Sequence, residues 1–271
     1  MVAVVIVLSA TLVASWLLQR SVLQLLWNAG LVRGNFRGKS IVPGLGIIVA
    51  LSSVVGYTVA AVVQPRNSVD YSVVFGVILS AYVGLIDDLA GRDSGKGFLG
   101  HFGRSLGSFA ATTGVLKAVF ISLGGILVSR AVSESLWETL LRGVSVALTT
   151  NLLNLLDLRP GRCVKAYLAI LALATAVCGF EFLRYGPVFV GAISVVHMDL
   201  QERAMLGDCG SNLLGFAVGT QVALAAPVWF LIVWAAILFA LNIASEKYSF
   251  TSIIESNRVL RWLDMIGRSE H

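Results

Sequence analysis

Acidic residues stand at the ends of long apolar segments at three separate places in this sequence. Asp87 and Asp88 end one such segment. Asp157 ends another, and Asp208 stands directly before a third. An ionisable side chain at the edge of a membrane-spanning helix is costly, so it indicates a functional site. Mg²⁺ is typically held by one or two carboxylates together with substrate phosphates. If the three places meet on one side of a membrane, they predict a site for a metal ion and phosphate groups.

The composition is that of a polytopic membrane protein. Of the 271 residues, 57% are hydrophobic and 13% are charged, and the mean hydropathy is +0.85. These values exclude an ordinary soluble domain. Charged residues are absent from Met1–Gln19, from Ile41–Val63 and from Cys209–Ser245, where Pro227 divides the stretch into two helices. The stretches lack the period-two alternation of barrel strands. The net charge of +5 gives no indication of nucleic-acid binding.

We therefore expect an all-α integral membrane protein with about nine transmembrane helices. A spanning helix needs roughly 20 mostly apolar residues. The expected helices cover residues 2–19, 43–63, 71–87, 105–128, 137–156, 165–183, 186–198, 209–226 and 228–245. Residues 1–245 would form the transmembrane domain, and residues 246–271 a cytoplasmic tail. Apolar and arginine residues alternate in that tail in the manner of a short amphipathic helix on the membrane surface.

The orientation follows from the lysine and arginine residues, which concentrate in cytoplasmic loops. With the N-terminus outside and the first helix retained, the outer loops contain only Arg66, Arg130 and Arg184. Most of the remaining basic residues fall in the inner loops. All the acidic motifs then face the cytoplasm, and the chain is expected in the inner (cytoplasmic) membrane.

Basic residues in the same inner loops are suited to phosphate groups. Lys39, Lys96, Arg104, Arg159 and Arg162 would neutralise a diphosphate. Phosphoryl transfer mainly needs positioned reactants and charge stabilisation, so carboxylates, a metal ion and basic residues suffice for it.

Each acidic or basic feature also has a simpler interpretation. Asp208 alone would be an N-cap, at a helix start whose amides favour anions. Asp157 with Asn154 would be a polar contact between helices. Lys117, inside a helix, is expected to pair with a neighbouring helix or to contact the groove for the lipid chain rather than to act in catalysis. Only the joint occurrence of these features on one membrane face favours a reaction site.

Four ordered motifs resemble those of the polyprenyl-phosphate N-acetylhexosamine-1-phosphate transferases, which include phospho-N-acetylmuramoyl-pentapeptide transferase and the GlcNAc-1-phosphate transferases. Gly84-Leu-Ile-Asp-Asp88 is similar to the family's Gly-Phe-x-Asp-Asp motif. Asn154-Leu-Leu-Asp157 is similar to its Asn-Leu-x-Asp motif, and Leu206-Gly-Asp-Cys-Gly-Ser211 to its Gly-Asp-x-Gly-Ser motif. Lys39 followed by Pro43-Gly-Leu-Gly46 matches its lysine with a Pro/Gly-rich turn. The likeness extends from about residue 33 to residue 245.

The resemblance implies an enzyme that transfers a sugar 1-phosphate from a UDP-sugar of the N-acetylhexosamine type to polyprenyl (undecaprenyl) phosphate, with release of UMP. Such a glycosyltransferase starts a lipid-linked cell-envelope glycan, as in cell-wall and peptidoglycan biogenesis. Its cofactor would be Mg²⁺, with Mn²⁺ as an alternative, and homodimers are common in the family.

The resemblance also assigns roles to residues of this chain. Asp208, together with Asp88, would bind the metal ion, and Asp87, Asp88 and Asp157 would be catalytic. The substrate contacts would come from Lys39, Lys96, His101, Arg104, Asn154, Gly207 and Ser211, and in addition from Arg159 and Arg162, which add positive charge where the family has its second aspartate. His101 is equally well explained by a structural role.

The chain departs from the family pattern after Asp157. The family continues with a second aspartate three residues later, where this chain has Pro160, and the family's histidine-containing late loop is absent. These departures favour an alternative, a catalytically inactive relative that binds lipid phosphate or nucleotide sugar and regulates envelope synthesis. A transporter with a cation site is a further alternative, although transporters more often place charges at the bilayer centre in broken helices.

Overall fold

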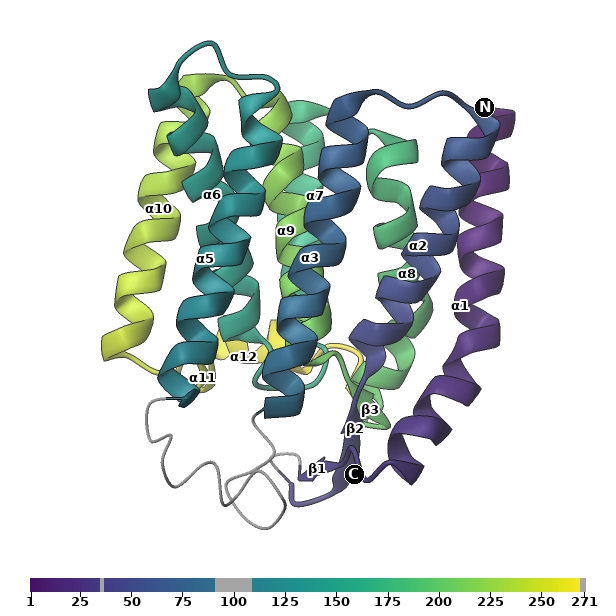
Figure 1. Ribbon diagram of the computed structural model, residues 1–271. Coiled ribbons are helices and arrows are strands. Elements are labelled where there is room, and N and C mark those ends of the chain that lie inside the picture. Colours follow the sequence, from purple (N-terminus) through teal and green to yellow (C-terminus); the bar gives the residue numbers. More distant parts are fainter. Residues whose placement is uncertain (35–36, 91–108, 269–271) are drawn as a thin grey trace.

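The computed structural model describes residues 1–34, 37–90 and 109–268. Its long helices run side by side in one bundle (Figure 1). The helices are α1 (Val2–Asn28), α2 (Leu45–Val63), α3 (Ser68–Ala90), α5 (Phe109–Arg130), α6 (Leu136–Leu156), α7 (Arg162–Cys178), α8 (Phe182–Leu200), α9 (Gly207–Ala225), α10 (Val228–Lys247), α11 (Phe250–Ser256) and α12 (Arg258–Met265). The strands are β1 (Arg33–Gly34), β2 (Ser40–Pro43) and β3 (Ala204–Met205).

The expectation of an all-α membrane protein is confirmed, because the described residues are mainly helical and include helices that could span a membrane. Among the described residues, 5 helices are long and apolar enough to cross a membrane: α1, α2, α3, α6 and α10. Large apolar side chains cover the outside of α1 and α10, and Trp16, Leu17 and Phe239 are each more than half exposed. Such a surface requires an apolar surrounding. The predicted break at Pro227 is also present, because α9 ends at Ala225 and α10 begins at Val228.

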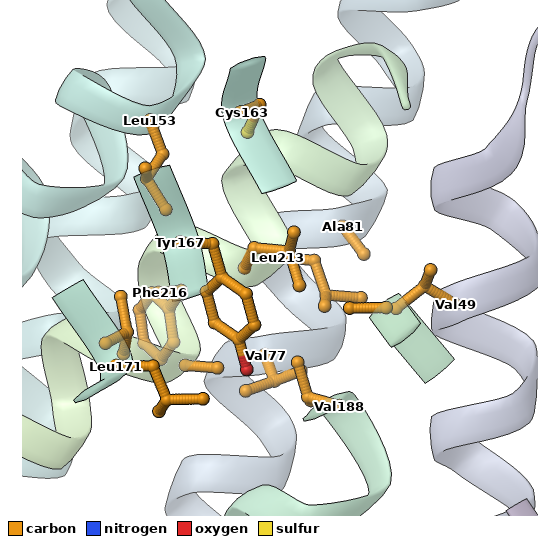
Figure 2. Close-up of a cluster of buried hydrophobic side chains, with 14 of the residues drawn as sticks. Val49, Val77, Ala81, Leu153, Cys163, Tyr167, Leu171, Val188, Leu213 and Phe216 are labelled. Atoms are coloured by element: carbon orange, nitrogen blue, oxygen red, sulfur yellow. The ribbon is translucent and has the colours of Figure 1, made fainter. Parts of the chain in front are cut away.

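The centre of the bundle is α9, which is buried along almost its whole length. Figure 2 shows how side chains from several helices meet around it. Tyr167 of α7 and Phe216 of α9 lie in this cluster, with Val77 of α3, Val188 of α8 and Leu153 of α6 nearby. A helix that is apolar on all sides belongs in the core. The core thereby fixes the position of α9, at whose first turn Asp208 lies.

The helices alternate in direction, and this alternation brings the acidic motifs to one end of the bundle. In Figure 1 the last residues of α3 and α6 and the first residues of α5 and α9 lie at the lower end, together with the three strands and the tail helices α11 and α12. The expectation that the acidic motifs share one face is therefore met in the fold.

A small sheet that the sequence does not predict lies at the same end. β1 pairs antiparallel with β2, with Arg33 opposite Ile41, and β2 pairs parallel with β3, with Val42 opposite Ala204. Strands of 2 and 4 residues are too short for the alternation that reveals a strand in a sequence. The sheet ties the loop after α1 to the residues just before α9.

Close contact between α3 and α9 depends on Gly84. A Cβ atom at this position would lie 2.2 Å from the backbone oxygen of Asp208. The absence of a side chain lets the two helices approach at this point. Asp87 lies one turn further along the same helix, so the close approach also brings its carboxylate near the start of α9.

Candidate functional site

Four helices contribute to a polar cluster at this end of the bundle. At its centre is Lys117 of α5, whose Nζ lies 2.7 Å from Asp87 Oδ2 and 3.1 Å from Asp208 Oδ2. The same Nζ lies 3.3 Å from Asn154 Oδ1. The side chain of Asn154 also donates from Nδ2 to Asp208 Oδ1 at 2.9 Å and to Ser211 Oγ at 3.0 Å. The structure thus brings together residues from three of the four predicted motifs. We call Asp87, Lys117, Asn154, Asp208 and Ser211 the carboxylate cluster.

Lys117 is the member of this cluster that the sequence analysis did not assign to the site. It was expected to pair with a neighbouring helix, and it does so with α3, α6 and α9 at once. Its side chain is only 13% exposed. A lysine among apolar residues of a helix is the signal that pointed to a partner. The identity of the partners depends on how α5 is rotated, which a single helix sequence does not reveal.

Asp88 is adjacent to Asp87 but has different partners. Its Oδ2 accepts a hydrogen bond from the backbone amide of Cys209 at 2.9 Å. Arg33 donates from Nη2 to the Asp88 backbone oxygen at 2.7 Å, and its Nη1 lies 3.7 Å from Asp88 Oδ1. The carboxylate of Asp88 therefore occupies the amides at the start of α9. In this structure Asp87, rather than Asp88, shares a partner with Asp208.

The start of α9 also corrects the predicted role of Asp208 as an N-cap. The helix begins at Gly207, so Asp208 lies within its first turn, and the residue before the helix, Leu206, makes no side-chain cap. The capping carboxylate comes from Asp88 of α3 instead. Gly207 has a φ of +74°, and a Cβ atom there would lie 2.8 Å from Asp88 Oδ2. Glycine is therefore required by both the backbone and the space. Gly207 acts by making room for Asp88.

Asp157 follows the last residue of α6 and is the C-cap of that helix. Burial raises the pKa of the Asp157 carboxyl well above its ordinary value, and the nearby charges of Asp199, Asp208 and Asp88 raise it further, whereas a hydrogen bond from the Gly207 amide acts in the opposite direction. Asp199 was not predicted from the sequence. It is buried, and its Oδ2 accepts a hydrogen bond from the Gly161 amide at 3.0 Å.

Arg159 and Arg162, expected to contact substrate phosphates, contact the C-terminal tail. Arg162 forms a two-point ion pair with Asp264 of α12, with distances of 2.9 Å from Nε to Oδ1 and 3.0 Å from Nη2 to Oδ2. Arg159 Nη2 lies 2.8 Å from Glu255 Oε1 of α11. The side chain of Arg162 is only 5% exposed. These contacts give no support to a role of Arg162 in phosphate binding, because its Nε and Nη2 atoms are already paired with the carboxylate of Asp264.

The remaining predicted residues are distributed as follows. Lys39 is exposed and stands just before β2. Lys96, His101 and Arg104 lie outside the described residues. The structure therefore offers no placement for these three predicted phosphate contacts.

A pocket of about 350 Å³ opens beside the carboxylate cluster, between α5 and α6. Its polar lining includes Lys117, Asn151 and Asn212, and its apolar lining includes Ile121, Val144 and Leu148. Asn212 is buried, and neither atom of its amide group has a hydrogen-bond partner among the described residues. A smaller apolar pocket of about 190 Å³ lies between α3 and α5, beside Tyr82 and Phe120. Pockets with one polar end and an apolar remainder suit an amphiphilic ligand.

The carboxylate cluster meets the requirements of a Mg²⁺ ion only in part. Asp87, Asp208 and Asn154 offer the oxygen atoms that Mg²⁺ prefers. No group of three or more His, Cys, Asp or Glu side chains is placed to hold a metal within residues 1–34, 37–90 and 109–268. The Lys117 ammonium contacts one oxygen of each of Asp87, Asp208 and Asn154. While it does so, a divalent cation does not fit among them.

Comparisons with protein-family models and with curated proteins found no match for this chain. The family resemblance therefore depends on the four motifs alone. What the structure adds is the position of those motifs, since Asp87, Asn154 and Asp208 come from α3, α6 and α9 and have Lys117 as a common partner.

Proposed function

We propose that the chain transfers a sugar 1-phosphate from a UDP-sugar to a polyprenyl phosphate and releases UMP. The observation that carries the proposal is the carboxylate cluster, in which Asp87, Asn154 and Asp208 lie within 3.3 Å of Lys117 Nζ. These residues come from motifs that are distant along the chain, and each motif has a counterpart in the transferase family. A merely structural use of each motif would not require them to meet.

The reaction joins two phosphate groups. An oxygen of the lipid phosphate attacks the β-phosphorus of the UDP-sugar, the bond from that phosphorus to the bridging oxygen breaks, and UMP leaves with that oxygen. Positioning and charge stabilisation are the main requirements of such a transfer. Asp87 is the better candidate to orient the lipid phosphate, since the Asp88 carboxylate is engaged at the start of α9. Asn154 and Ser211 would contact the donor.

The pocket between α5 and α6 supports the lipid half of the proposal. The pocket between α5 and α6 has Lys117 and Asn212 at its polar end and Val144 and Leu148 along its apolar walls. A polyprenyl phosphate has the same division into a charged head and an apolar chain. Its phosphate would lie against Lys117, and its first isoprene units would lie along Leu148.

The proposal includes the topology. The nine long helices of the described residues, α1 to α3 and α5 to α10, would each cross the inner membrane. The end of the bundle that carries the cluster would face the cytoplasm. The excess of lysine and arginine in the loops at that end supports this orientation.

The decisive experiment measures UMP. Purified protein in detergent micelles is incubated with undecaprenyl phosphate and a panel of UDP-N-acetylhexosamines, once with Mg²⁺ and once with a chelator. UMP release with at least one donor is expected, with loss of release in Asp87→Asn and Asp208→Asn. Glu134→Gln serves as the control, because Glu134 is exposed between α5 and α6 at the opposite end of the bundle.

A second candidate function is a non-catalytic relative that binds lipid phosphate and regulates envelope synthesis. Two observations favour it. Pro160 stands where the family has its second aspartate, and the nearby Arg162 is engaged by the tail. Absence of UMP release with every donor, together with retained binding of undecaprenyl phosphate, would decide in favour of this second function.

A further inference from the structure

The carboxylate cluster already contains a cation. An ammonium group has three N–H donors and no acceptor. For Lys117 the three acceptors are Asp87 Oδ2 at 2.7 Å, Asp208 Oδ2 at 3.1 Å and Asn154 Oδ1 at 3.3 Å. All three donors are thus directed at the cluster, and the side chain is 13% exposed. Lys117 therefore has the position and the contacts of a bound cation.

The energetics favour this arrangement over an empty carboxylate pair. Removing a lysine from water is costly unless it is paired, and two carboxylates close to each other are unfavourable unless a cation lies near them. The Lys117 Nζ contacts one oxygen of each carboxylate, so the lysine is paired and the two aspartates have a cation between them. Two negative charges and one positive charge leave the group with a single net negative charge.

A divalent metal and the ammonium exclude each other at this place. Mg²⁺ requires oxygen ligands at 2.0–2.1 Å in octahedral geometry. Its natural ligands here would be Asp87 Oδ2 and Asp208 Oδ2, the same two oxygens that the ammonium contacts. A metal ion between those atoms would also face the positive charge of Lys117 at close range.

We propose that Lys117 is the resident cation of the Asp87–Asp208 pair and that the pair holds it in place of a divalent metal. The inference rests on the proposed function only in taking this cluster to be the reaction site. A substrate phosphate would reach the cation by replacing Asn154 Oδ1, the longest of its three contacts. The ammonium then donates a hydrogen bond to the phosphate and remains paired with both carboxylates. The family resemblance implies Mg²⁺ at this site, so the inference separates this chain from that expectation.

The test measures binding of Mn²⁺, which electron paramagnetic resonance detects directly, to the purified full-length protein in detergent. Lys117→Met removes the charge at similar length, and we expect it to bind Mn²⁺ about tenfold or more tightly than the wild type. The gain should disappear in the double variant Lys117→Met/Asp208→Asn. Lys117→Arg, which keeps the charge, should bind as weakly as the wild type. Lys247→Met is the control for removal of a lysine, since Lys247 is exposed at the end of α10.

The outcomes separate clearly. Equal Mn²⁺ affinity in the wild type and in Lys117→Met, whether tight or undetectable in both, overturns the inference. If Lys117→Met does not fold, Lys117→Gln, which keeps hydrogen-bond donors without the charge, takes its place in the same comparison. The Mn²⁺ measurement requires no turnover, so it can fail while UMP release succeeds, and the reverse also holds. In the activity assay, UMP release that continues in the chelator is the expected companion result, and complete dependence on Mg²⁺ contradicts the inference.

Discussion

The carboxylate of Asp88 accepts a hydrogen bond from the backbone amide of Cys209, which joins the end of α3 to the start of α9. Asp87, the preceding residue, points its carboxylate to Lys117 instead. Asp88 therefore has a structural role at the start of α9, and Asp87 belongs to the carboxylate cluster. Their substitutions should differ in stability and in activity.

Replacement of Asp88 by alanine should destabilise the protein. The change removes the capping acceptor of α9, which is worth about 0.5–2 kcal/mol in comparable cases. It also leaves Arg33 without its carboxylate partner. Thermal unfolding in a single detergent measures the effect. The matched variant Asp87→Ala leaves Lys117 paired with Asp208, so it should lower the unfolding temperature less than Asp88→Ala does, while it abolishes UMP release. Equal destabilisation by the two variants would contradict these separate roles.

Replacement of Asp157 by asparagine should stabilise the protein, in contrast to replacement of Asp88. Burial and the neighbouring carboxylates raise the pKa of Asp157 in the folded state well above the value of about 3.9 expected in the unfolded chain. The folded state therefore holds this proton more tightly, and stability falls as the pH rises from about 3.9 to the folded-state pKa. Asp157→Asn, which cannot ionise, should be more stable than the wild type at neutral pH.

The measurement for Asp157 is the unfolding temperature of both proteins across the acid and neutral range. The advantage of Asp157→Asn should be small near pH 4, grow as the pH rises, and become constant above the folded-state pKa. An advantage that is equal at every pH would show that packing, and not ionisation, is its cause.

The ion pair between Arg162 and Asp264 should hold the C-terminal tail on the bundle. Burial acts to raise the pKa of Asp264, but the hydrogen bonds of Arg162 and the charge of Arg268 outweigh it, so the pKa lies below its usual value. A carboxylate with a lowered pKa contributes stability above its unfolded value of about 3.9, and this contribution is lost as the pH falls through the folded-state pKa. We expect the tail to stay attached at neutral pH and to detach only when the pH falls through the folded-state pKa of Asp264, below the unfolded value of about 3.9.

Limited proteolysis tests the attachment of the tail. Asp264→Asn at neutral pH should be cleaved between α10 and α12 about tenfold faster than the wild type, since a hydrogen-bonded ion pair is lost. Glu255→Gln is the matched control. Its pair with Arg159 is exposed on the glutamate side, at 55%, and exposed pairs contribute little. Equal cleavage of the two variants would show that Asp264 does not hold the tail.

The bundle and the shared end of the acidic motifs could be predicted from the sequence, because both depend on long-range regularities. Apolar runs reveal spanning helices, and their alternation in direction decides which loops lie together. The break at Pro227 was visible because proline cannot continue a helix. For the same reason, Asp87, Asn154 and Asp208 could be expected at one end.

The contacts within that end could not be predicted, because they depend on how each helix is rotated about its axis. The preference of Asp88 for the Cys209 amide, and of Asp87 for Lys117, is decided by the close approach of α3 and α9 at Gly84. The partners of Arg162 could not be foreseen either, since they come from the tail helices α11 and α12, about a hundred residues later. Asp199 gave no motif at all, and only its burial beside Gly161 reveals it.

The pocket between α5 and α6 gives the last prediction, which concerns the lipid substrate. Ala147 lines this pocket beside Leu148 and Val144. A phenylalanine at position 147 would occupy part of its volume of about 350 Å³ and obstruct an apolar chain. We expect Ala147→Phe to raise the KM for undecaprenyl phosphate by about tenfold, the effect of losing roughly 1.4 kcal/mol of apolar contact. The KM for the UDP-sugar should stay near the wild-type value, because the cluster at the polar end is unchanged.

Leu12→Phe, on the exposed face of α1, is the control for added aromatic bulk on a spanning helix. An equal rise in both KM values would indicate a displaced α6 rather than an obstructed pocket, and unchanged values would remove this pocket from the path of the lipid.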